Sequence, residues 1–251
     1  MTNECKSSCS SILLFAGLGI IGLALAFSGF KIFEGLKYFR SYDRFVTVKG
    51  LATKDMRADL AVWSVNFTVT GNDLPQAQSQ LEVNREKVTA FLTANGLGGN
   101  DIRIQSIQVA DKQAQTYSSG GGEGGPRYVL SQALIARTND VESMIKASQN
   151  VSQLIKDGVV LGQPNGGYNP APQYMFTKLN DIKPQMIAEA TKNARTSAEQ
   201  FAKDSGQEVG QIRSANQGVF EILPRDPNIV ETETPDKTVR VVTTVEYYLA
   251  D

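Results

Sequence analysis

The sequence predicts an α+β protein in which one N-terminal transmembrane helix is followed by a domain with a mainly antiparallel sheet. Three observations predict this: an uncharged apolar run near the N-terminus, strand segments with alternating apolar residues, and helical segments that separate pairs of those strands. The 251 residues then divide into an N-terminal tail at 1–11, a transmembrane signal anchor at 12–30, a juxtamembrane neck at 31–44 and a domain at 45–251. The tail is expected in the cytoplasm.

The segment 12–30 (ILLFAGLGIIGLALAFSGF) contains no charged residue, no Asn or Gln and no Pro. A buried helix of a soluble protein would show polar residues at helical period, and a span of about 28 Å matches the ~30 Å hydrocarbon core of a bilayer. Ala24 and Ala26 leave signal-peptide cleavage open, but the apolar run continues beyond them, which favours an uncleaved anchor. The expected anchor side chains are Ile12, Leu13, Leu14, Phe15, Leu18, Ile20, Ile21, Leu23, Leu25, Phe27 and Phe30.

Two features beside this run predict opposite orientations of the anchor in the membrane. Basic residues in the neck 31–44 would keep the domain in the cytosol under the positive-inside rule, although long domains often cross a membrane regardless of that bias. Cys5 and Cys9 are the only cysteines, and both precede the anchor. An exported domain would then contain no thiol that could oxidise wrongly, so we expect export.

Strands are predicted by alternation at period two. Ala61, Trp63, Val65, Phe67 and Val69 share one face of a first strand. The segment 239–249 alternates in the same way and predicts the last strand. Between them, strands are expected at 102–109, 128–136, 174–178 and 209–222.

Helices are expected at 74–95, 140–156 and 182–204. Asp73 is the expected N-cap of the first helix, and Asn139 with Glu142 has capping-box spacing at the second, which Gly158 would end. Asp181 is the expected cap of the third helix. That helix has a stripe of mostly small residues at Met186, Ala190, Ala194, Ala198 and Ala202, flanked by Ile182, Ile187 and Phe201.

The order of these elements repeats. A strand, a helix and two strands occupy about 59–138 and again about 172–250, which predicts two βαββ units joined by the middle helix. Two loops stand out, a Gly-rich one at 118–126 and one rich in Gly, Pro and Asn at 161–172.

The composition excludes many chemistries and predicts no enzyme. No histidine is present, so catalysis by a Ser-His-Asp triad and His-ligated metal sites are excluded, and two cysteines cannot fill a tetrahedral zinc site. The net charge of −1 gives no footprint for nucleic acid. Glu231, Glu233 and Asp236 cluster, but a solvated acidic loop between the last two strands is the favoured interpretation. No catalytic, cofactor or metal site is therefore predicted.

Five aromatic residues are candidates for an oligomer or ligand interface: Tyr168, Tyr174, Phe176, Tyr247 and Tyr248. Core packing is the default for such residues. If they were exposed beside the loops, they would act as interface anchors.

Several segments, in order, resemble the SIMPL-domain family (YggE-like, a domain of unknown function). The similar segments are Val46–Gly50, Ala58–Ala61, Asp101–Ile104, Ala190 to Gly206 with its alanines, Val209–Ile212 and Val241–Tyr247. Ala58 departs from the pattern, since the family usually has Pro before the Asp.

This resemblance implies an α+β domain exported to the bacterial cell envelope. It further implies self-association into a homo-oligomer, including ring-like assemblies, with loose links to stress defence, and it supplies no catalytic residues. We therefore expect a single-pass protein of the bacterial inner membrane with a periplasmic domain, whose partners are the membrane and itself. A periplasmic ligand- or peptide-binding module that uses the Pro-rich loop and its tyrosines is the alternative, with the small-molecule ligand unknown.

Overall fold

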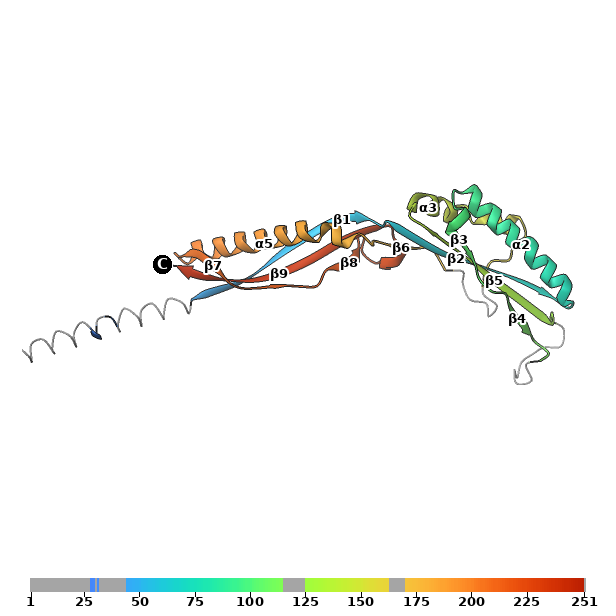
Figure 1. Ribbon diagram of the computed structural model, residues 1–251, viewed down its shortest axis with the longest axis horizontal. Helices are drawn as coiled ribbons and strands as arrows, with labels where there is room; N and C mark the ends of the chain where they lie inside the picture. Colours follow the sequence, from blue (N-terminus) through green and yellow to red (C-terminus); the bar gives the residue numbers. More distant parts are fainter. Residues whose placement is uncertain (1–27, 30, 32–43, 115–124, 163–169, 251) are drawn as a thin grey trace, which may run out of the picture. The chain divides into compact units, whose positions relative to one another are not determined.

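The computed structural model describes residues 28–29, 31, 44–114, 125–162 and 170–250 (Figure 1). The predicted anchor side chains lie outside these residues, as do both cysteines and Tyr168. Within the described ranges, no helix is long and apolar enough to cross a membrane.

The chain contains both strands and helices, and six of its strand pairings are antiparallel, which confirms the predicted α+β class. The elements are β1 (Phe45–Arg57), β2 (Leu60–Gly71), α2 (Leu74–Ala94), β3 (Ile102–Ile104), β4 (Gln108–Asp111), β5 (Tyr128–Thr138), α3 (Val141–Gln149), α4 (Ser152–Lys156), β6 (Gln173–Met175), α5 (Leu179–Asp204), β7 (Glu208–Gln217), β8 (Glu221–Pro224) and β9 (Asp236–Ala250).

These elements form two compact units. The α2 unit consists of Thr53–Met186 and Phe220–Arg240. The α5 unit consists of the chain up to Ala52 together with Ile187–Val219 and Val241–Asp251. Each unit is described separately below.

In the α2 unit, the strands lie in the order β3-β5-β2-β6, with β4 also paired to β5. The β2–β5 register runs from Ala61 opposite Thr138 to Gly71 opposite Tyr128. Helices α2, α3 and α4 lie over one face of this sheet (Figure 1). The predicted apolar face of β2 is buried there, because its alternate side chains pack against those helices.

The first helix forms as predicted. The Asp73 carboxylate accepts a hydrogen bond from the Gln76 N–H at 2.8 Å, and Pro75 occupies the first turn, where no intrahelical donor is needed. The stripe Ala77, Leu81, Val88, Phe91 and Leu92 is buried against the sheet.

The predicted middle helix is wrong in two respects. It is two helices, α3 and α4, because the chain leaves the helix at Asn150, whose side-chain amide donates to Asn95 Oδ1 at 3.0 Å. Asp140 rather than Asn139 is the N-cap, and its Oδ1 accepts from the Ser143 N–H at 3.2 Å. The predicted stop at Gly158 is confirmed, since Gly158 has a φ of 82° beyond the end of α4.

The sheet of the α5 unit corrects the predicted repeat. Strand β6, expected to open the second βαββ unit, pairs with β2 instead, with Ala61 opposite Tyr174. The N-terminal strand β1 takes the vacant position, and the second sheet has the order β1-β9-β7 with β8 on β9. The repeat persists in another form, because the strand after the helix is split in both sheets and pairs with one long strand.

Helix α5 begins at Leu179, one turn earlier than predicted, so Asp181 lies in its first turn rather than at its cap. The small-residue stripe is confirmed: Met186, Ala190, Ala194, Ala198 and Ala202 are all buried. Phe201 was expected beside this stripe but is 59% exposed. The alanine stripe lets α5 pack closely against the sheet, but the contact is narrow, so the large Phe201 side chain beside the stripe lies outside it.

The closest approach between α5 and the sheet is at Gly50 in β1. A Cβ built on Gly50 would lie 1.8 Å from the Ala190 carbonyl oxygen and 2.5 Å from the Ala194 nitrogen. Both obstructing atoms belong to the helix backbone, so no side-chain rotation could relieve the clash. Gly50 is required for this packing distance.

We predict that Gly50→Ala lowers the free energy of unfolding by about 1–3 kcal/mol, the usual cost of forcing extra volume into a packed core. Urea denaturation followed by circular dichroism measures the change. Gly125→Ala is the matched control, because a Cβ at Gly125 meets no atom within 4 Å. Equal unfolding midpoints for the two variants would contradict the close packing of α5 on β1.

We also predict that Thr243→Val stabilises the protein by about 1 kcal/mol, because an unpaired polar atom in a core is costly. Thr243 Oγ1 is buried and lacks a hydrogen-bond partner among the described residues. Thr244→Val, on the opposite and partly exposed face of β9, serves as control. A Thr243→Val protein that melts below the wild type would show that the hydroxyl is satisfied.

Candidate binding surfaces

The predicted interface aromatics do not form an exposed cluster. Tyr174, Phe176 and Tyr247 are buried at 5%, 7% and 1% exposure, and Tyr248 is partly exposed. Most of them therefore pack inside the protein, as core residues do. Tyr174 differs from Phe176 and Tyr247 because it also lines a pocket.

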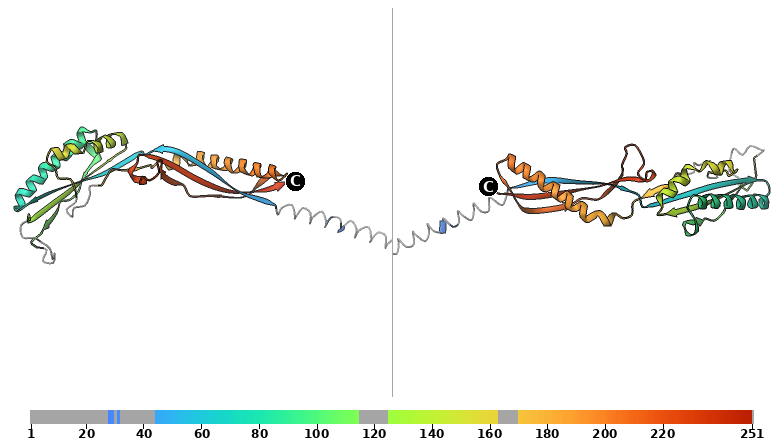
Figure 2. Two further views of the ribbon diagram at one scale, coloured as in Figure 1. Left: turned by 180° about the vertical axis from the view of Figure 1, so that it is seen from behind. Right: turned by 90° about the horizontal axis from the view of Figure 1, so that it is seen from above.

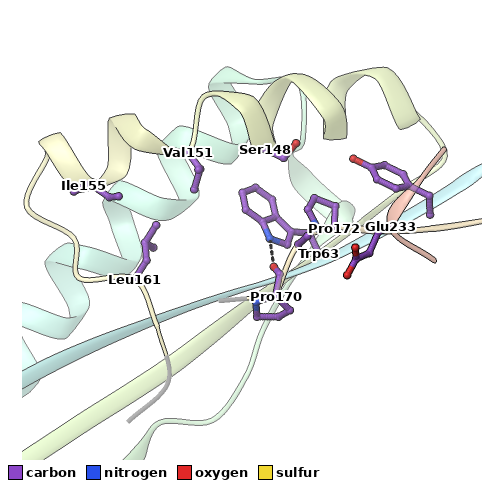
Figure 3. A pocket seen from close by; sticks show the side chains of 10 residues that line it. Trp63, Ser148, Val151, Ile155, Leu161, Pro170, Pro172 and Glu233 are labelled. Carbon is purple, nitrogen blue, oxygen red and sulfur yellow. Dashed lines mark hydrogen bonds between the residues drawn. The ribbon is translucent and has the colours of Figure 1, made fainter. Parts of the chain in front are cut away.

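This pocket has a volume of about 510 Å³ and lies in the α2 unit (Figure 3). Figure 3 shows Val151 and Ile155 on one side, Leu161 and Pro170 on the other, and Trp63 between them. Its complete lining is Trp63, Ser148, Val151, Ile155, Leu161, Pro170, Ala171, Pro172, Tyr174 and Glu233.

The pairing of β6 with β2 brings together Tyr174 and Trp63, the two aromatic walls of the pocket. Tyr174 in β6 is opposite Ala61 in β2, and Trp63 lies two residues further along β2, so both rings project from the same sheet face as diagonal neighbours. The end of β6 is held by Asp59, whose carboxylate accepts from the Thr177 N–H at 2.6 Å and from its hydroxyl at 2.8 Å. This contact fixes the short strand β6 against the start of β2.

The polar atoms of Trp63 and Tyr174 leave little capacity to bind a charged ligand. Trp63 Nε1 donates to the Pro170 carbonyl at 2.9 Å, which uses the only donor of the indole. Burial raises the pKa of the Tyr174 phenol, an effect that the Ser148 side chain partly offsets. Tyr174 therefore stays neutral at physiological pH. The two aromatic walls of the pocket are therefore uncharged.

The three acidic residues singled out in the sequence do not converge. Glu231 pairs with the fully buried Lys237 at 2.6 Å, and Asp236 pairs with Arg225 at 3.1 Å and with Arg57 at 3.5 Å.

Glu233, the third of these residues, lines the pocket, and its carboxylate makes no ion pair or hydrogen bond with the described residues, although its backbone N–H donates to the Val230 carbonyl at 3.0 Å. In the described part of the chain, no group of three or more carboxylates and thiols is arranged to hold a metal ion.

A second surface is the face of the β1-β9-β7 sheet opposite α5. Among the described elements of the α5 unit, none covers this face (Figure 2). Phe45 and Leu51 of β1 are 41% and 46% exposed, and alternation places both on it. The Arg213 guanidinium lies 4.0 Å above the Phe45 ring and 3.8 Å from the Glu246 carboxylate.

Sequence reasoning named Tyr174 and the Pro-rich loop as a candidate ligand interface, and both line this pocket, but it did not place Trp63 or Glu233 beside them. Trp63 was assigned to a core face, Tyr174 to a loop-associated aromatic group and Glu233 to a solvated loop. The one available signal was the position of Tyr174 directly after the Pro-rich loop. The pairing of β6 with β2 joins residues more than a hundred positions apart, which local patterns cannot reveal.

Comparison with curated proteins finds no similar sequence. The family model described as "SIMPL: Protein of unknown function (DUF541)" matches residues 46–247. This match covers β1 to β9, and therefore both sheets of the described structure. The chain belongs to the SIMPL family.

Proposed function

We propose that the protein is a non-enzymatic, membrane-anchored component of the bacterial cell envelope whose periplasmic domain assembles into a homo-oligomer. The observation that carries the proposal is the uncovered sheet face of the α5 unit. A second copy of the chain is the proposed partner for this face. A role in stress defence, which the family resemblance suggests, would be a consequence of this assembly.

The chemistry of the sheet face supports association between identical copies. Phe45 and Leu51 supply apolar area near the edge of the sheet, while Arg213 and Glu246 supply opposite charges on the same face. Such a face is self-complementary when two copies meet across a two-fold axis, because each charge can then meet its opposite. Exposed aromatic and aliphatic residues with a nearby Arg are typical of interface centres.

The apolar run 12–30 supports the membrane anchor. It is long enough to span a bilayer, and β1 begins at Phe45, only a short neck away. An anchor confines the domains to two dimensions and raises their effective concentration, so a modest sheet interface would suffice for assembly.

We predict that Leu51→Glu shifts the full-length protein from oligomer toward monomer, weakening association by more than about tenfold because it buries an unpaired charge. Size-exclusion chromatography with light scattering, in a neutral detergent, measures the protein mass against the 27.3 kDa of one chain. Val83→Glu is the matched control, since Val83 is 44% exposed on α2 and belongs to the α2 unit.

A wild-type protein that is monomeric at all concentrations would overturn the proposal. Equal oligomer masses for Leu51→Glu and Val83→Glu would leave self-association intact but contradict its assignment to this sheet face. Circular dichroism checks that both variants are folded.

We further predict that the mature protein keeps its N-terminal segment. Protein extracted from membranes should have an intact mass near the 27.3 kDa of the whole chain, because the apolar run continues past the small-residue site. Mass spectrometry measures this directly. A mature chain that begins after Ala26 would replace the anchor with a cleaved signal peptide.

A further inference from the structure

We propose that the pocket lined by Trp63, Tyr174 and Glu233 binds a small organic cation. The apolar part of the ligand would contact the aromatic and proline walls, and its positive charge would face Glu233. This site is independent of self-association, because every lining residue belongs to the α2 unit.

The size and walls of the pocket suit a small molecule. Its volume of about 510 Å³ lies within the range of 300–1,000 Å³ that is usual for small-ligand sites. Trp63 and Tyr174 are held in place by strand pairing and by the Trp63–Pro170 hydrogen bond, so the walls are formed before a ligand arrives. A preformed site avoids the entropic cost of ordering its own side chains.

The charges that line the pocket favour a positively charged ligand. Among the described residues that line the pocket, Glu233 has the only charged side chain, and Tyr174 stays neutral. The nearby acidic residues are already neutralised: Glu231 by Lys237, and Asp236 by Arg57 and Arg225.

Among the described residues, the Glu233 carboxylate thus has no partner at this aromatic pocket. Aromatic faces attract cations and offer nothing comparable to an anion. The lining contains a carboxylate and aromatic rings but no basic group, so it favours ammonium-type ligands and disfavours carboxylates and phosphates.

The natural source of such a cation could be a free amine or a lysine side chain of a short peptide, and both have the same chemistry. Phenethylammonium represents the first, and an acetylated, amidated Phe-Lys dipeptide the second. 3-Phenylpropionate has a similar size with the opposite charge, and phenethyl alcohol is neutral.

The test uses the full-length protein in a neutral detergent. Trp63 is the only tryptophan of the chain, so its fluorescence reports on this pocket alone. We expect phenethylammonium to change the emission saturably and to bind at least about tenfold more tightly than 3-phenylpropionate. Titration calorimetry provides a second readout that does not depend on the indole.

Glu233→Gln should weaken phenethylammonium binding about fivefold, the usual scale for an exposed charge pair, and leave binding of phenethyl alcohol unchanged. Glu82→Gln removes one carboxylate from the exposed side of α2 and should change neither. Tighter binding of the dipeptide than of the amine would assign the cation to a peptide, and the reverse to a free amine. Equal affinity for cation and anion, no saturable binding by either readout, or equal effects of the two Gln variants would overturn the proposal.

Discussion

The α2 unit depends on the antiparallel pairing of β2 with its two neighbours. The register with β5 buries one face of β2 beneath α2, α3 and α4, and the short register with β6 brings Tyr174 beside Trp63. A slip of one residue would turn every buried side chain of β2 to the opposite face and remove both pocket walls. Asp59 opposes such a slip, because its carboxylate bonds Thr177 and its own N–H donates to the Met175 carbonyl at 3.0 Å.

The α5 unit depends on a different constraint, the distance between a helix and a sheet. Gly50 and the alanine stripe remove the side-chain layer that normally separates the two, so backbone lies almost directly on backbone. This close contact buries little apolar area for each residue, since alanines have small side chains. No described element of the α5 unit covers the opposite face of this sheet, so a unit stabilised in this way would gain more from the proposed self-association than a unit with a full core.

Local patterns predicted the parts of the fold that local physics determines. Alternation identified the buried face of β2, and the Asp73 cap and the Ala190–Ala202 stripe formed as expected. The break at Asn150 was missed because it depends on Asn95, which lies on another helix end. No strand was predicted at 45–57, so β1 and its place in the second sheet were missed, and the segment of β6 was assigned to that sheet instead. Tyr174 and the Pro-rich loop were named as a candidate ligand interface, but their meeting with Trp63 follows from the pairing of β6 with β2, which local patterns do not show.

The loop between β8 and β9 shows why a cluster of acidic residues in a sequence is a poor guide to chemistry. Glu231, Glu233 and Asp236 are close in sequence, yet each faces a different environment. Lys237 is fully buried and needs a partner, because an unpaired buried ammonium is prohibitively costly, and Glu231 supplies that partner. Asp236 is paired with two partly exposed arginines, Arg57 and Arg225. Once those structural demands are met, Glu233 is the one carboxylate of the three that can act on a ligand.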